Sequence, residues 1–270
     1  MDHSTLLRPP PIPHEHGAWA FLVIPLVLGS AAGGLGAPAP LLVWPAVVLA
    51  FFGRYAAMPA AARLVEGKST PAEFLARRLA WAAAYLAGAG ACALAAVLSA
   101  GAEARRGTIA MVGLAGALAI VHTGLALAGL GRSLPGEILG LTGLACSAPL
   151  VVAAGGHPLD GRAAGAGLLA LVQPLSALAF VRFFRSPAGE RRAALARCAA
   201  MHLGLLAGLV LLWRLGWLPG AALFSFIPLV ARGPWTMLSP PRNLRSVGMR
   251  EIAISSSFLI LASAALLLRR

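Results

Sequence analysis

Charged residues are scarce in this chain, and acidic residues are scarcer still. Only 11% of the 270 residues are charged, 59% are hydrophobic, and nine Asp and Glu stand against 22 Lys and Arg. Soluble domains carry about 25% charged residues, so polar groups could not cover a water-soluble body of this size. The composition excludes an ordinary soluble domain and indicates a protein that uses lipid as its solvent.

Aspartate is nearly absent, because Asp2 and Asp160 are the only examples, and the sequence has three cysteines. Free cysteine is commonly buried, and the three show no metal-ligand spacing. No phosphate-binding loop and no serine or cysteine nucleophile motif is found, and glycines within apolar runs are interpreted as helix-packing residues. The sequence therefore predicts no metal and no cofactor.

Long apolar runs are abundant. A bilayer-spanning helix needs roughly 20 mostly apolar residues. Nine runs fit this length approximately: 17–35, 38–58, 78–100, 108–130, 134–155, 163–184, 198–215, 217–232 and 251–268. The stretch 235–250, with two prolines and three arginines, is predicted to be a surface loop or a short interfacial helix. The predicted fold class is an all-α integral membrane protein with about nine transmembrane helices.

The distribution of Lys and Arg predicts the orientation. With nine spans, the N-terminus and the loops after even-numbered spans hold 16 of the 22 basic residues, and the other side holds six. Short cytoplasmic loops carry the excess of Lys and Arg, so the N-terminus is predicted in the cytoplasm and the C-terminus outside. The net charge of +13 is explained by this bias and by attraction to anionic lipid, so no nucleic-acid partner is expected.

Two segments share the same Arg-Pro-Arg spacing, RYAAMPAAAR (54–63) and RFFRSPAGER (182–191). PLVLGSAAGG and PLVVAAGG, at 25–34 and 149–156, extend the similarity to the preceding spans. An offset of four spans predicts two parallel repeats. The predicted organisation is a polar cytoplasmic N-terminus (1–16), a first four-helix repeat (17–130), a second four-helix repeat (131–232), a cytoplasmic loop (233–250) and a final transmembrane helix (251–270).

The repeated arginines are the main candidate site. Arg54, Arg63, Arg182 and Arg185 would lie on the same face, where repeat halves commonly form a shared site. Guanidinium groups bind phosphate and carboxylate, so a shared pocket would face an anion. The alternative is that each arginine extends separately to the membrane surface from a helix end.

Other polar residues at the ends or inside the apolar runs are secondary candidates. The segment PHEHGAW places His14, Glu15 and His16 before the first span; it is interpreted as a metal ligand set, as a helix-start anchor with Trp19, or as part of a polar pocket. Ionisable or polar groups at membrane depth are functional candidates. They include Glu137, His122, Gln173, Ser176 and His202, although His122 could instead bond a neighbouring helix.

The segment HEHGAWAFLVIPLVLGS resembles the opening of the YwiC-like family of bacterial membrane proteins, and PPRNLRSVGMREIAISSSFLIL resembles the C-terminal part of that family. This resemblance implies a bacterial cytoplasmic membrane location but no reaction. The predicted spans are also similar to the UbiA superfamily of intramembrane prenyltransferases. That superfamily holds Mg²⁺ with aspartate motifs after spans two and six, where this chain has arginines and no aspartate.

These observations favour binding of an amphiphile with an anionic head, either isoprenoid or phospholipid-like, in a cytoplasm-facing cavity. If the chain is an enzyme, the UbiA resemblance implies a prenyl- or lipid-transferase that does not use aspartate-bound Mg²⁺. A transporter of a small anion or lipid and a non-catalytic subunit of a membrane complex are the alternatives.

Overall fold

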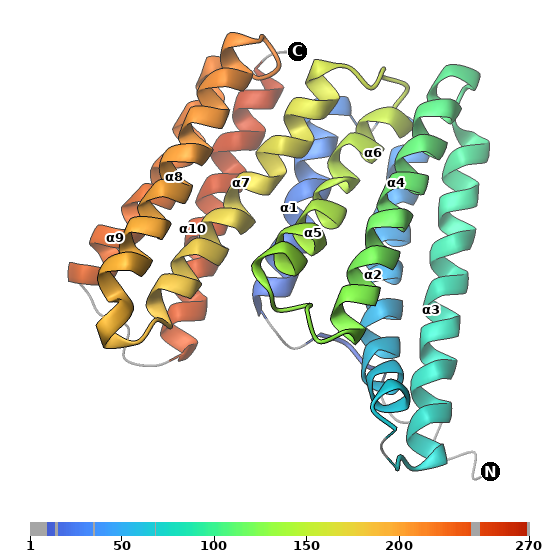
Figure 1. The fold of residues 1–270 in the computed structure, drawn as a ribbon. Helices are drawn as coiled ribbons and strands as arrows, with labels where there is room; N and C mark the ends of the chain where they lie inside the picture. Colours follow the sequence, from blue (N-terminus) through green and yellow to red (C-terminus); the bar gives the residue numbers. More distant parts are fainter. Residues whose placement is uncertain (1–9, 14–15, 35, 68, 239–243, 269–270) are drawn as a thin grey trace.

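The computed structural model describes residues 10–13, 16–34, 36–67, 69–238 and 244–268. Within these ranges the chain forms α-helices and short 3₁₀ helices joined by turns (Figure 1). The elements are α1 (His16–Gly33), α2 (Pro38–Val65), α3 (Ala72–Ser99), α4 (Ala102–Leu127), α5 (Leu134–Ala145), α6 (Ser147–Ala154), α7 (Gly161–Phe184), η2 (Ala188–Glu190), α8 (Arg191–Arg214), η3 (Gly220–Phe226), α9 (Ile227–Leu238) and α10 (Leu244–Leu267).

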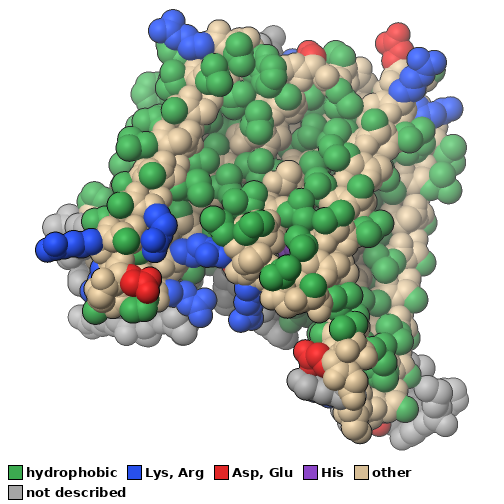
Figure 2. All heavy atoms as spheres, in the orientation of Figure 1, with side chains coloured by type: hydrophobic (Ala, Val, Ile, Leu, Met, Phe, Trp, Pro, Cys, Tyr) green, Lys and Arg blue, Asp and Glu red, His purple; other side chains and the backbone are tan. Residues whose placement is uncertain are grey.

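The helices have the length and composition of membrane spans. Seven segments in the described part of the chain are long and apolar enough to cross a membrane, and Ala18–Gly33 adds a shorter apolar helix. In Figure 2, charged side chains lie toward the two ends of the molecule and hydrophobic side chains cover the band between them. The predicted fold class, an all-α integral membrane protein, is confirmed.

The predicted eighth span, 217–232, differs from expectation because it is not one α-helix. α8 ends at Arg214, and Gly216 then adopts a φ of +72°, which glycine accepts without steric cost. The chain continues as the 3₁₀ helix η3 and then as α9. Pro228, the second residue of α9, has no N–H to bond back into η3, so the hydrogen-bond ladder is interrupted where the helix type changes.

The predicted fifth span, 134–155, is divided into α5 and α6 at Cys146. Pro149 lies in the first turn of α6 and cannot donate to the carbonyl group of Ala145, so the hydrogen-bond ladder is interrupted. The loop predicted over 233–250 is also shorter than expected. α9 continues to Leu238 and α10 already begins at Leu244.

α1 packs against α6, α7 and α10 in the interior of the helix assembly. α1 approaches α6 closely at two glycines, Gly29 and Gly33, which lie four residues apart on one face. A Cβ atom at Gly29 would lie 2.5 Å from the carbonyl oxygen of Ala148, and one at Gly33 would lie 2.8 Å from Cα of Val152. Small residues allow two helix backbones to approach this closely.

The AAGG sequences at the ends of PLVLGSAAGG and PLVVAAGG occupy corresponding places in the structure. Gly34 and Gly156 follow the last turns of α1 and α6, with φ values of +83° and +88°. The ring of His157 then bridges the two segments, since Nε2 lies 2.8 Å from the carbonyl oxygen of Gly33. The two segments therefore pair with each other, while the four-plus-four repeat stays a prediction.

Candidate functional site

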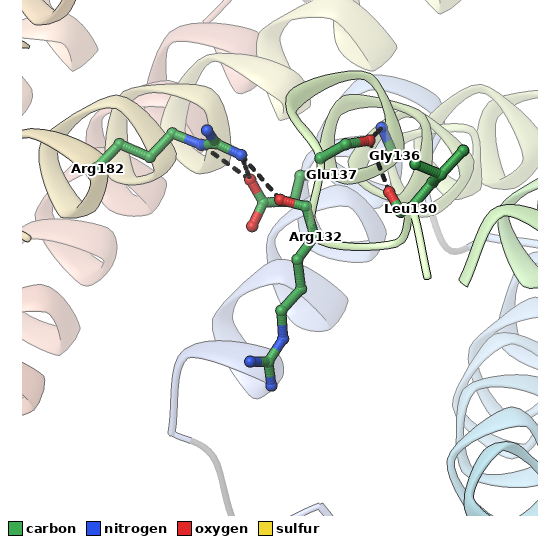
Figure 3. A network of polar contacts seen from close by, with 6 residues as sticks. Leu130, Arg132, Gly136, Glu137 and Arg182 are labelled. Carbon is green, nitrogen blue, oxygen red and sulfur yellow. Dashed lines mark hydrogen bonds and ion pairs between the residues drawn. The ribbon is translucent and has the colours of Figure 1, made fainter. Parts of the chain in front are cut away.

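Arg182, in the last turn of α7, forms an ion pair with Glu137 in the first turn of α5 (Figure 3). Its Nε donates to Oε2 of Glu137 at 3.0 Å, and its Nη2 also donates to the carbonyl oxygen of Arg132 at 3.1 Å. The two side chains are 43% and 32% exposed, so solvent screens the pair. Arg182 therefore fastens the start of α5 to the end of α7.

Arg54 on α2 has a different environment, because its hydrogen-bond partner is a neutral hydroxyl group. Its Nε donates to Oγ1 of Thr123 on α4 at 3.4 Å, and the side chain is half-buried. The neighbouring His122 packs over α5, where a Cβ atom at Gly140 would lie 2.4 Å from the imidazole Cε1. No carboxylate pairs with Arg54 among the residues that the structure describes.

The other two predicted arginines lie in separate surroundings. Arg63 stacks on the ring of Phe74 on α3 at 4.9 Å, and Arg78 approaches the same ring at 5.6 Å. Arg185 follows the last residue of α7 and is exposed. The contacts given above place Arg54, Arg63 and Arg182 against three different partners, so a shared anion pocket stays a prediction.

The PHEHGAW segment is described only in part. His14 and Glu15 lie outside the described residues, and His16 begins α1 without a described side chain. Trp19 donates from Nε1 to the carbonyl oxygen of Pro13 at 3.3 Å and meets the ring of Phe52 edge-on at 5.5 Å. These contacts fix the start of α1 against α2. No cluster of metal-ligating side chains occurs among the described residues.

A buried polar cluster lies between α7, α8, α9 and α10, and its ion pair, Arg232 with Glu251, was not predicted from the sequence. Its centre is Arg232 on α9, whose side chain is only 1% exposed. The Nε atom of Arg232 lies 3.1 Å from Oε1 of Glu251, and Nη1 donates to Oγ of Ser176 at 3.3 Å. The guanidinium group also lies over the ring of Phe180 at 5.3 Å.

Ser176 connects this cluster to His202 on α8. Nδ1 of His202 lies 2.8 Å from the carbonyl oxygen of Cys198, which can only accept, so in the neutral ring Nδ1 carries the proton. Nε2 then accepts from the Ser176 hydroxyl group at 2.8 Å. Deeper in the bundle, Gln173 donates to Ser255 at 2.7 Å. The predicted polar residues Gln173, Ser176 and His202 thus belong to one region.

Two signals could have revealed this cluster. Glu251 and Arg232 are ionisable residues next to or within apolar runs, and such residues have a functional or pairing role by default. The sequence interpretation instead treated Arg232 only as a contribution to membrane orientation. A cleft opens beside the pair and is lined by, among others, Phe180, Phe184, Arg232, Trp235, Arg250 and Glu251.

The helices and their apolar composition define a multi-pass integral membrane protein. A family model described as YwiC-like protein matches residues 12–154, which is more than half of the chain and covers α1 to α6. The chain belongs to the YwiC-like family. No curated protein and no solved structure matches it.

Proposed function

We propose that this YwiC-like protein binds an amphiphile with an anionic head, either isoprenoid or phospholipid-like. The observation that supports the proposal best is the missing counter-charge of Arg54. A cation within a membrane-spanning helix is costly unless an anion or a strong acceptor compensates it. Arg182 has Glu137 and Arg232 has Glu251, whereas among the described residues Arg54 has only the hydroxyl group of Thr123.

An anionic head group would provide the acceptor that Arg54 lacks. Nε of Arg54 is engaged with Thr123, and the two Nη groups form the part of the guanidinium fork that suits a phosphate or carboxylate. Exposed Arg185, on the same predicted cytoplasmic face, would add to the attraction for the head. The apolar tail would lie along the helices, in the surroundings it already has in the bilayer.

The proposal also includes the location of the protein in the membrane and the arrangement of its helices. The excess of 16 basic residues over six favours a cytoplasmic N-terminus and an outside C-terminus in a bacterial cytoplasmic membrane. Parallel repeats in a UbiA-like arrangement would place Arg54 and Arg182 on the cytoplasmic side. No aspartate occurs near either arginine, so the proposed binding does not rely on aspartate-bound Mg²⁺.

Lipid retention by the full chain tests the role of Arg54. Native mass spectrometry would compare wild-type protein, Arg54→Gln and the control Arg106→Gln, each reconstituted with phosphatidylglycerol and phosphatidylcholine. Arg106 is an exposed arginine near the start of α4. A charge-assisted hydrogen bond contributes about 1.5–3 kcal/mol, so R54Q should weaken retention of phosphatidylglycerol roughly tenfold or more, while R106Q retains it.

Equal retention by wild type and R54Q would contradict the proposal. Glu15, outside the described residues, provides a second check. If E15Q and R54Q destabilise the protein equally while both retain wild-type amounts of phosphatidylglycerol, the partner of Arg54 is a protein carboxylate and the proposal is wrong.

A further inference from the structure

The cleft between α7, α9 and α10 contains more positive than negative charge. Arg232 and Arg250 line it together with one carboxylate, Glu251. The Glu251 carboxylate approaches Arg232 through one oxygen only, at 3.1 Å from Nε, and its Oε2 atom has no hydrogen-bond partner among the residues that the structure describes. The cleft lining therefore contains two guanidinium groups and one carboxylate, which is paired with Arg232, so one positive charge is uncompensated within it.

Both guanidinium groups are held by aromatic rings. Arg232 lies over Phe180 at 5.3 Å, and Arg250 lies over Trp235 at 5.5 Å. A ring below the guanidinium plane interacts with its face and leaves the N–H groups at its edge available for an acceptor. The ring contacts themselves occupy no N–H group, although Nη1 of Arg232 donates to Ser176 and Nε faces Glu251.

Within the described part of the chain, Nη2 of Arg232 and Nη1 of Arg250 are buried and have no hydrogen-bond partner. Nε of Arg232 meets Glu251 as an ion pair without hydrogen-bond geometry, and the Arg232 side chain is only 1% exposed. A buried polar group without a partner costs about 1–3 kcal/mol, and more when it is charged. An anion that accepts from both groups would remove this cost.

We propose that this cleft, which is narrow in this structure and widens when the exposed Phe184 and Trp235 side chains move, is a phosphate-binding site, occupied by the phosphomonoester head of an amphiphile or by free phosphate. A phosphomonoester has three terminal oxygens and a charge of about −1.5 to −2 at neutral pH. Two guanidinium groups can therefore both bind to one phosphate more readily than both can bind to one carboxylate. Phe184 and Trp235, which are 46% and 42% exposed, provide apolar contact for the first part of a tail. The site shares no residue with the Arg54 proposal and stands independently of it.

Binding to the full-length protein in phosphatidylcholine nanodiscs tests the site. The probes are dihexanoyl phosphatidic acid, dihexanoyl phosphatidylcholine and inorganic phosphate, measured by isothermal titration calorimetry. Arg250→Gln should weaken binding of the phosphatidic acid about tenfold or more, and Arg250→Lys, which keeps the charge without the planar fork, should weaken it less. Arg214→Gln is the matched control, because Arg214 also stacks on a tryptophan, Trp213 at 5.1 Å, at the other end of the bundle.

Glu251→Gln should strengthen binding of the phosphatidic acid, whereas Arg250→Gln should weaken it. Misfolding would not produce stronger binding. This variant removes the carboxylate that competes for Arg232, so binding of the phosphatidic acid should become several-fold tighter. Tighter binding of phosphatidic acid than of inorganic phosphate assigns the site to a lipid head, and equal affinity assigns it to free phosphate. The site is refuted if R250Q binds like R214Q, if E251Q binds more weakly than wild type, or if phosphatidylcholine binds as well as phosphatidic acid. Arg54→Gln should leave this affinity unchanged.

Discussion

Gly29→Ala should destabilise the protein, although alanine favours a helix more than glycine does. An added Cβ atom would lie 2.5 Å from the carbonyl oxygen of Ala148 and 2.9 Å from its Cα. Both atoms belong to the backbone, so no rotamer change can relieve the contact. To bring the shorter distance to 3.0 Å, α1 and α6 would have to move apart by at least 0.5 Å.

The expected magnitude follows from two opposing contributions. Overpacking of a close interface costs typically about 1–3 kcal/mol. Replacing glycine by alanine within a helix returns up to about 1 kcal/mol. Because α1 also packs against α7 and α10, separation from α6 would disturb those contacts too, so the overpacking should exceed the gain. We expect a net loss of roughly 1–2 kcal/mol in the free energy of unfolding.

Gly204→Ala is the matched control on α8, because a Cβ atom there meets nothing within 4 Å. It should leave stability unchanged or raise it by up to about 1 kcal/mol. Unfolding in mixed micelles with increasing sodium dodecyl sulfate, followed by circular dichroism, would measure both variants. Equal or greater stability of G29A relative to G204A would refute the close approach of α1 and α6.

The polar contacts provide two further predictions. Arg232→Met should lower the free energy of unfolding by about 3–5 kcal/mol, because it leaves the largely buried Glu251 carboxylate unpaired. The double variant Arg232→Met with Glu251→Gln should lose less stability than the single variant. A double variant that is less stable than the single one in the same unfolding assay would contradict this. The partly exposed Arg182–Glu137 pair should show a coupling free energy of less than about 1 kcal/mol in a double-mutant cycle, and this energy should fall as salt is added. A larger coupling energy that does not change with salt would be inconsistent with the exposure of the pair.

Hydropathy predicts the spans that form one regular α-helix, but it does not predict where the backbone hydrogen-bond pattern changes within a span. The expected run 163–184 corresponds closely to α7 at Gly161–Phe184, because both its length and its apolar composition fit a membrane span. The run 217–232 is equally apolar, yet it forms η3 followed by α9. Apolar composition carries no information on whether N–H groups bond three or four residues back. Pro228 interrupts the hydrogen-bond ladder where the helix type changes.

Partners of the arginines could not be predicted, for a different reason. Glu137 is 45 residues from Arg182, and Thr123 is 69 residues from Arg54. Such contacts depend on which helices are neighbours, and spans of similar hydropathy give no preference among neighbours. Ser176 and Gln173 could be assigned to one face of α7 from their spacing, but their partners His202 and Ser255 lie on other helices.

Two of the repeated arginines, Arg54 and Arg182, have contacts close to the start of α5. Arg182 reaches α5 directly through Glu137. Arg54 bonds Thr123, whose neighbour His122 packs over Gly140, three residues after Glu137 on α5. Both contacts therefore lie near the first turns of α5, and Arg182 is already paired with Glu137 there. A head group that contacted both would have to take Arg182 from Glu137. Since that pair is exposed and weak, an anion of two charges could make the exchange where a monoanion would gain little.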